Sequence, residues 1–204
     1  MSLYSYHSFV GTRLRAFYVP ILLLVCVVIH SSAFAQTTTW LGGAGNWSNP
    51  GKWSAGVPTG TSTALIDNGN GAASPVTLDV NGSATNLSID SDDSLSFNNG
   101  VSLSIGASGG GTINNVGHLN INSAGSVTEL IVVNAAPAAV MLTGGGTLNM
   151  SNNPNNVIGI FGGGLANVNN TIQGRPHWQH PDGVKQSGHD QRQHWRRGCQ
   201  PAHH

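Results

Sequence analysis

The sequence contains very little cysteine. Only two of its 204 residues are cysteines, Cys26 and Cys199, and both lie towards the ends of the chain. The region between Gln36 and Gly174 therefore lacks the thiols needed for a disulfide framework or for a thiolate metal site. We expect its stability to come from repeated hydrogen bonds and stacking instead of cross-links.

Charge is equally scarce, at 8% of the chain, and Lys52 is the only cation between Gln36 and Gly174. The acidic residues of this region are Asp67, Asp79, Asp90, Asp92, Asp93 and Glu129. A mildly acidic region without a basic patch cannot hold a phosphate backbone, which argues against nucleic acid as a partner. Enzymes that cleave polysaccharides need clustered carboxylates, and these are scattered. We therefore predict no catalytic residues, no cofactor and no enzymatic activity.

The first 35 residues have the pattern of an export signal. Arg13 and Arg15 precede the apolar run "FYVPILLLVCVVI", and "SSAFAQ" supplies small residues for cleavage after Ala35. A membrane anchor is the alternative, but the run is shorter than the about 20 residues that span a bilayer. We expect residues 1–35 to be a cleaved signal peptide. The chain would then be secreted or bound to the cell surface, with no stable membrane span after cleavage.

Residues 61–174 consist of short segments in which apolar and small polar residues alternate. The alternating pairs are Leu87/Ile89, Leu95/Phe97, Leu103/Ile105, Leu119/Ile121, Val140/Leu142 and Leu148/Met150. A period of two predicts strands with one buried face, and the spacing of about eight residues lets three strands form one coil. The sequence predicts an all-β fold, a parallel β-helix (solenoid) of short strands, with a β-sandwich as the alternative.

Asparagine is frequent between these segments. Asn98, Asn114, Asn152, Asn155 and Asn169 stand at predicted turns, where asparagine side chains of successive coils can stack into ladders. Such ladders favour the solenoid over the sandwich.

Three stretches carry a family resemblance: "TTTWLGGAGNWSNPGKWSAGVPTGTSTALIDNG", "VTLDVNGSATNLSIDSDDSLSFNNGVSLSIG" and "LTGGGTLNMSNNPNNVIGIFGGGLANVNNTIQG". They resemble the repeat regions of bacterial exported β-helix proteins, the autotransporter-associated and filamentous-haemagglutinin-like surface proteins. The resemblance implies the N-terminal part of a non-catalytic, adhesin-like segment. Its partner would be an extracellular glycan or the surface of a host or neighbouring cell. Such proteins usually continue through many more coils.

Residues 36–60 hold three tryptophans, Trp40, Trp47 and Trp53, in a segment rich in glycine, proline and asparagine. We favour an N-terminal cap, because the terminal repeat of a solenoid must cover the end of its core. The alternative is a carbohydrate-binding module in which the indole rings stack on sugars. A fragment of a polysaccharide-acting enzyme is the weakest alternative function.

Asp90, Asp92 and Asp93 offer oxygen ligands for calcium, but they lack the glycine and the bidentate glutamate of a calcium loop. We therefore expect a solvated acidic turn and no metal site. His118 is the only histidine between Gln36 and Gly174, and we expect it to be solvated.

Residues 175–204 differ in composition from everything before them. They contain five of the eight Lys and Arg residues and six of the nine His residues. Metal binding and a basic aromatic arm are two interpretations. A third is a frameshift of one base near Gly174, since the next frame from Pro176 permits "HIGNTQMGLNNQGMINANIG". We favour the frameshift and expect a disordered tail. The last coil would then be uncovered and available for self-association.

Overall fold

The computed structural model describes residues 35–66, 69, 71–106, 110–175 and 177–179. The chain divides into two units, residues 1–34 and 35–204, and the fold described below belongs to the second. Nearly all of the predicted signal peptide, and the predicted tail from residue 180 onwards, lie outside the described residues. Within the described part, no helix has the length and apolar character needed to cross a membrane.

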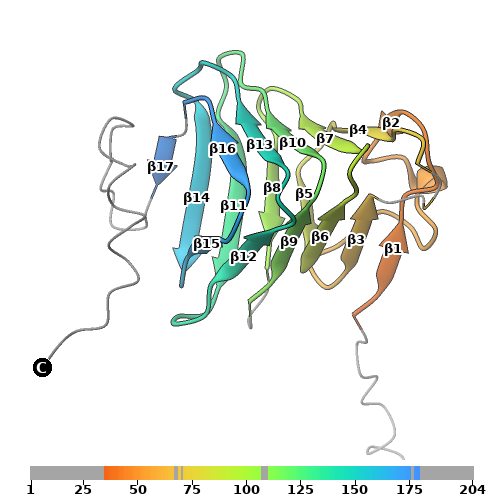
Figure 1. The fold of residues 1–204 in the computed structure, drawn as a ribbon, viewed down its shortest axis with the longest axis horizontal. Coiled ribbons are helices and arrows are strands. Elements are labelled where there is room, and N and C mark those ends of the chain that lie inside the picture. Colours follow the sequence, from red (N-terminus) through yellow and green to blue (C-terminus); the bar gives the residue numbers. More distant parts are fainter. Residues whose placement is uncertain (1–34, 67–68, 70, 107–109, 176, 180–204) are drawn as a thin grey trace, which may run out of the picture. The chain divides into compact units, whose positions relative to one another are not determined.

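The second unit is a parallel β-solenoid with three sheets (Figure 1). The first sheet contains β1 (Thr37–Thr39), β3 (Thr63–Ile66), β6 (Asn86–Ile89), β9 (Thr112–Asn115), β12 (Val140–Thr143) and β15 (Leu165–Asn167). The second contains β2 (Gly45–Asn46), β4 (Pro75–Leu78), β7 (Ser94–Phe97), β10 (His118–Ile121), β13 (Thr147–Met150) and β16 (Thr171–Gln173). The third contains β5 (Gly82–Ala84), β8 (Ser102–Ile105), β11 (Thr128–Asn134), β14 (Asn156–Gly162) and β17 (His177–Gln179). A short 3-10 helix, η1 (Pro50–Lys52), follows β2.

Each full coil contributes one strand to each sheet, and the next coil lies beside it in the same register. Strands β6, β7 and β8 form one such coil, and they carry Leu87, Leu95 and Leu103. The predicted rhythm of about eight residues is therefore confirmed. Every pairing between named strands in the described residues is parallel. Parallel coils confirm the solenoid and exclude the sandwich, whose sheets are antiparallel.

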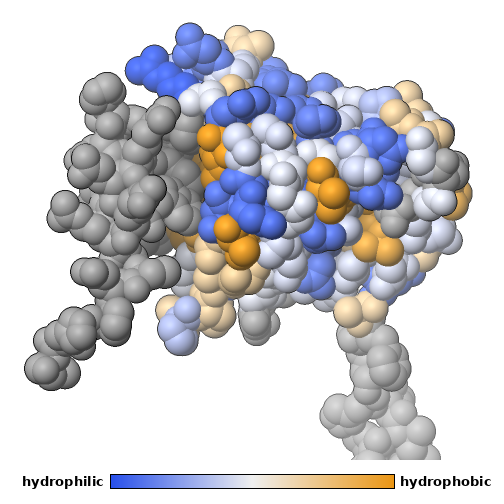
Figure 2. Space-filling model, in the orientation of Figure 1, coloured by the Kyte–Doolittle hydropathy of each residue, from blue (hydrophilic) through white to orange (hydrophobic). Residues whose placement is uncertain are grey.

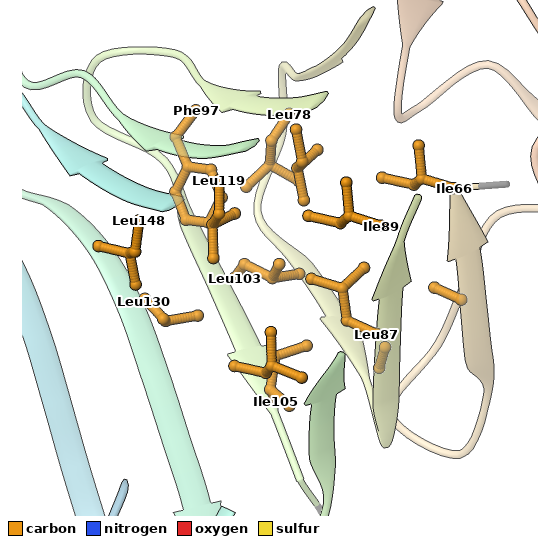
Figure 3. Packing of buried hydrophobic residues seen from close by; sticks show 14 of the residues in the cluster. Ile66, Leu78, Leu87, Ile89, Phe97, Leu103, Ile105, Leu119, Leu130 and Leu148 are labelled. Atoms are coloured by element: carbon orange, nitrogen blue, oxygen red, sulfur yellow. The ribbon is translucent and has the colours of Figure 1, made fainter. Parts of the chain in front are cut away.

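The core is a set of apolar columns that run along the solenoid axis. In the second sheet, Val76, Leu95, Leu119 and Leu148 follow one another from coil to coil, and all are buried. Figure 3 shows inward side chains of all three sheets meeting in the core, for example Leu87, Leu119 and Leu103. All six predicted alternating pairs are buried. Full burial of one such side chain contributes roughly 1.5–3 kcal/mol, so stacking coils is the main source of stability.

The outward residues of the second sheet form a polar ladder. Asn120 Nδ2 donates to Ser96 Oγ at 3.1 Å, and Asn149 Nδ2 donates to Asn120 Oδ1 at 2.9 Å. Gln173 Nε2 adds the next rung by donating to Asn149 Oδ1. In the view of Figure 2 the hydrophilic and neutral residues predominate, and the hydrophobic ones lie in separate spots.

The ladder of side chains lies on strands, whereas we predicted it at turns. Of the predicted asparagines, Asn114 donates to Ser88 Oγ of the neighbouring coil at 3.3 Å. Asn155 donates to Gly125 O, and Asn169 accepts from Gly145 N, so these two bond to the backbone of the preceding coil. The prediction of stacked amides was wrong for Asn155 and Asn169, whose side chains bond to backbone groups, whereas Asn114 does bond to a side chain of the neighbouring coil and lies on β9.

The solenoid also extends beyond the predicted boundaries of 61 and 174. Strands β1 and β2 lie within residues 36–60 and pair with β3 and β4. Strand β17 lies after Gly174 and pairs with β14 from His177 to Gln179. The ladder therefore begins inside the tryptophan segment and continues for one short strand into the residues predicted to be a tail.

Candidate functional site

The three tryptophans form one cluster at the N-terminal end of the solenoid. Trp40 and Trp47 have an exposed fraction of 0%, and Trp53 of 3%. Trp53 lies between the other two, with ring centroids 5.1 Å from Trp40 and 4.9 Å from Trp47. Both contacts are edge-to-face, with interplanar angles of 80° and 72°, which suits the charge distribution of aromatic rings.

Local hydrogen bonds hold two of the indoles in place. Trp40 Nε1 donates to Gly43 O at 2.8 Å, and Trp53 Nε1 donates to Trp47 O at 2.8 Å. The Trp40 ring lies against the backbone of Gly45, where an added Cβ would be 3.1 Å from Trp40 Cζ2. The glycines of this segment therefore let the backbone wrap closely around the rings.

Trp47 lies where the third sheet begins. That sheet starts at β5, and a Cβ added at Gly82 of β5 would lie 3.1 Å from Trp47 Nε1 and 3.0 Å from Leu78 Cδ1. Gly82 leaves the space that the indole uses. Trp47 thus closes the core beside the third sheet, although its own Nε1 has no hydrogen-bond partner in the described part of the chain.

The chain after Trp47 covers the free edge of β1. Trp40 and Trp53 form an isolated antiparallel bridge, Leu41 N donates to Lys52 O at 2.8 Å, and Ser54 N donates to Thr39 O at 2.9 Å. Thr38 Oγ1 continues this contact by donating to Gly56 O at 2.8 Å. Residues 52–56 therefore occupy the backbone groups that an edge strand would otherwise expose.

This burial has a direct consequence for sugar binding. A stacking platform needs an open ring face, and Trp40, Trp47 and Trp53 have none in this structure. The rings instead cover the N-terminal end of the apolar core. Lys52 takes part from outside, with Nζ 5.7 Å from the Trp40 ring centroid and 3.0 Å from Gly42 O.

Asp79 fastens the cap segment to the next coil. Its two carboxylate oxygens accept from Ser48 N at 3.0 Å and from Ser48 Oγ at 2.5 Å. Burial raises the pKa of Asp79, but its hydrogen bonds, first those from Ser48 and then those from its own backbone and Asn46, together outweigh it and hold that pKa below its usual value. The carboxylate is therefore kept charged where it anchors the cap.

Asp93 differs from the solvated turn that we predicted, because it is only 1% exposed. Its Oδ1 accepts from Ser74 N, the residue before β4, at 2.6 Å, while Oδ2 has no partner in the described residues. Burial raises the pKa of Asp93, the Ser74 bond opposes this, and the charges of Asp92 and Asp90 raise it further. The solvation prediction was wrong for Asp93, since the side chain packs inward to bind the neighbouring coil.

The three aspartates that were considered as calcium ligands, Asp90, Asp92 and Asp93, belong to no group of candidate metal ligands in the part of the chain that is described. No three side chains of His, Cys, Asp or Glu there lie close enough to hold an ion. Asp90 Oδ1 accepts from Ser91 N, and the turn itself is closed by Asp93 N, which donates to Asp90 O at 3.2 Å. His118 is exposed on the outer face of β10.

An apolar outer face on the third sheet was not predicted from the sequence. In the register of β11 and β14, Ile131 lies beside Gly159 and Val133 beside Phe161. Val133 is 37% exposed and Phe161 50%. Burial raises the pKa of Glu129 on this face, and a Cβ added at Gly159 would lie 2.2 Å from Glu129 Oε1. The signal was the loss of alternation in "TELIVV" and "NVIGIF", where both faces are apolar.

No family model, curated protein or solved structure matches the chain. The fold is therefore established by the strand ladder itself, and the likeness to exported surface proteins depends on the residue pattern alone.

Proposed function

We propose that this chain is a non-catalytic structural segment of an exported bacterial surface protein, an adhesin-like β-solenoid stalk. The observation that supports this best is the stack of coils with polar, hydrogen-bonded outer positions, from Ser96 through Asn120 and Asn149 to Gln173. Such a stack grows in one direction by adding similar coils, which suits a spacer that holds a contact surface away from a cell.

The placement of the polar and aromatic groups supports the same proposal. Asp79 and Asp93 bind backbone or side chains of neighbouring coils, and the three indoles fill the core. These groups stabilise the solenoid in place of forming a reaction centre. The mildly acidic surface favours a glycan or another cell surface as the partner over nucleic acid.

Export is tested by expressing the full chain in a secreting bacterium and sequencing the N-terminus of the extracellular product. We expect the mature chain to begin at Gln36. The Ala35→Lys variant is the matched control, since a large charged residue at the cleavage position should leave the leader attached. A wild-type product that stays in the cytoplasm with Met1 intact would contradict the export proposal.

The structural role is tested separately on the exported product. Cells or beads coated with the chain should adhere to surfaces that carry the partner, while no polysaccharide should be shortened by it. Release of reducing ends from any polysaccharide by the purified chain, above a heat-denatured control, would contradict the non-catalytic assignment.

A further inference from the structure

Five asparagines of the sequence begin an N-x-Ser/Thr triplet, which is the acceptor sequence for a sugar attached to the asparagine nitrogen. They are Asn46, Asn81, Asn86, Asn149 and Asn169. A glycosyltransferase must reach both the amide nitrogen and the hydroxyl of the third residue, so a triplet whose groups are bonded inside a fold is a poor acceptor. The hydrogen bonds of the solenoid distinguish the five triplets.

At three of the triplets the asparagine side chain is already bonded. Asn86 Nδ2 donates to Thr63 Oγ1 at 3.2 Å, and Asn149 Nδ2 donates into the polar ladder at 2.9 Å. The side chain of Asn46 hydrogen-bonds to the carboxylate of Asp79. These amides join neighbouring coils, and a sugar on any of them would compete with that bond for the side chain.

The hydroxyls of the same three triplets are bonded as well. Ser48 Oγ donates to Asp79 Oδ2 at 2.5 Å. Ser88 Oγ accepts from an asparagine of the next coil at 3.3 Å, and Ser151 Oγ donates to a backbone carbonyl of the preceding coil at 2.9 Å. Both recognition groups of these triplets therefore serve the packing of the coils.

Asn81, in the turn between β4 and β5, differs from these three. Its Oδ1 accepts from Ser102 N at 2.9 Å, and its Nδ2 has no hydrogen bond in the described part of the chain. The oxygen and the nitrogen of a planar amide point in different directions, so the bond to Ser102 orients Nδ2 away from that backbone group. The Asn81 side chain is exposed. Its nitrogen is therefore held in a fixed direction and is accessible.

Ser83 provides the hydroxyl of the Asn81 triplet. A Cβ added at Gly82, between the two residues, would point into the core, 3.0 Å from Leu78 Cδ1 and 3.1 Å from Trp47 Nε1. Because side chains alternate along a strand, Asn81 and Ser83 both lie on the outer face. Ser83 Oγ has no hydrogen bond among the described residues. Both recognition groups of this triplet are free and lie on the same side of the chain.

The surroundings of Asn81 leave room for an enzyme. Val80 is 43% exposed, and residues 98–100 in the adjacent turn between β7 and β8 are exposed too. This turn belongs to an inner coil, with β2 and β7 on either side of β4, so its exposure does not depend on the ends of the chain. Asp79, two residues before Asn81, adds an acidic residue that the other four triplets lack at that position. A carboxylate beside the acceptor suits a transferase with a cationic groove.

Asn169 shares one of these features. Its Oδ1 accepts from Gly145 N at 3.1 Å, and its Nδ2 has no hydrogen bond among the described residues. It lies in the last coil, however, next to a part of the chain outside the described residues. We therefore base no site on Asn169.

We propose that Asn81 is an acceptor for N-linked glycosylation, in which a sugar passes from a diphosphate carrier to Asn81 Nδ2. The bond between the sugar C1 and Nδ2 forms as the bond between C1 and the diphosphate oxygen breaks. The amide gives one proton to a base of the transferase, and the diphosphate leaves with its carrier. Asn81 Oδ1 takes no part, so its bond to Ser102 N can persist in the product.

The test uses the purified, folded chain and transferases that accept N-x-Ser/Thr, one supplied with a nucleotide-diphosphate sugar and one with a lipid-diphosphate sugar. Mass spectrometry of the digested product gives the fraction of each asparagine that carries a sugar. Synthetic peptides of the same triplets provide the matched reference for each site. Relative to its own peptide, Asn81 should be modified in at least one system, whereas Asn46, Asn86 and Asn149 should remain unmodified. The system that works identifies the carrier.

Three variants separate the acceptor groups from the fold. Asn81→Asp keeps an oxygen for the bond from Ser102 N but replaces the nitrogen, so it should lose the sugar. Ser83→Ala removes the hydroxyl and should also lose the sugar, whereas Ser83→Thr retains a hydroxyl and should remain an acceptor. All three should melt within a few degrees of the wild type, because both positions lie on the outer face.

Two results would overturn the proposal. One is an unmodified Asn81 in the folded chain when its peptide is modified. The other is modification of Asn86 or Asn149 to the same extent as Asn81, relative to their peptides, because the fold would then select nothing. The inference rests on the proposed export only for bringing the chain to a transferase. The assay needs no export, so an unmodified Asn81 and a chain retained in the cytoplasm are separate failures.

Discussion

The first and last coils are made from similar strands, yet they end in different ways. In the first coil, the roughly twenty residues between β1 and β3 contain the tryptophan cluster, η1 and the covering segment 52–56. The last coil has β15, β16 and β17 with short turns and no comparable covering segment in the described residues. Among the described residues, the first coil therefore carries a segment that covers the edge of β1, whereas the last coil resembles the coils in the middle.

The difference shows that a repeat alone does not determine where a solenoid stops. Each inner coil has a neighbour on both sides, so its backbone and apolar side chains need no special residues. An end must provide both an edge cover and a core cover. Here residues 52–56 cover the edge of β1, and the buried indole of Trp47 covers the core beside the third sheet.

The largest expected effect is on stability, from a substitution in the cap. Trp47→Ala removes a fully buried indole beside Gly82 and should lower the free energy of unfolding by about 3–5 kcal/mol. Ile172→Ala in the last coil removes a side chain that is only partly buried, and should cost roughly 1–2 kcal/mol. Urea unfolding followed by circular dichroism measures both.

The matched control is Trp47→Phe, which keeps an aromatic ring in the core and should recover part of the loss. Equal costs for Trp47→Ala and Ile172→Ala would remove the distinction between the ends. The Trp47→Ala variant also tests sugar binding. If glycan binding disappears in Trp47→Ala without any change in unfolding, the ring acts on a ligand and is not needed for the cap.

An intermediate effect is expected in local opening. Amides of β1 that bond to neighbouring segments on both sides should exchange with deuterium more slowly than the Ile172 amide, which points away from β13 and meets no further strand among the described residues. Hydrogen exchange with mass spectrometry, carried out at a concentration where the chain is monomeric, measures the contrast. Ser54→Ala removes the bond from Thr39 N to Ser54 Oγ and should speed exchange at β1 alone. Uniform exchange at both ends would mean that the cap does not restrain its edge.

Much of the fold follows from the sequence because short strands encode it locally. The alternation at Leu87, Leu95 and Leu103 fixes which side chains point inward, and a spacing of about eight residues fixes three strands per coil. Paired residues of neighbouring coils lie between 19 positions apart, as for Val76 and Leu95, and 31 positions apart, as for Gly45 and Val76, so the turns differ in length while the strands keep their register.

The cap and the polar contacts follow less directly, because they depend on which segments meet in space. Nothing in "WLGGAGNWSNPGKW" distinguishes an exposed ring from a buried one, since burial depends on the space that Gly45 and Gly82 leave. Asp93 in "SIDSDDSLS" has the composition of a solvated turn, and its inward position is set by Ser74 of the preceding coil. The loss of alternation in β11 and β14 was visible and predicts the apolar outer face.

The smallest expected effect is a pH dependence with opposite signs at two carboxyls. The pKa of Asp79 is lowered in the folded chain, so its bonds to Ser48 contribute stability above the usual carboxyl pKa of roughly 4, and this is lost as the pH falls through the lowered value. The pKa of Asp93 is raised by burial, so its contribution is complete below that usual pKa and is lost as the pH rises through the raised value.

The free energy of unfolding of the Asp79→Asn and Asp93→Asn variants, measured from acid to neutral pH, distinguishes the contributions of the two carboxyls. Relative to the wild type, Asp79→Asn should lose stability as the pH rises, whereas Asp93→Asn should gain it, because asparagine resembles the protonated carboxyl that the buried site favours. The sequence has no carboxyl side chain between Glu129 and Asp182, and β15 and β16 lie within this interval. Acid should therefore loosen the end that Asp79 anchors and leave β15 and β16 unchanged. Hydrogen exchange at low pH that accelerates at β15 and β16 before β1 would contradict this assignment of acid sensitivity to the cap.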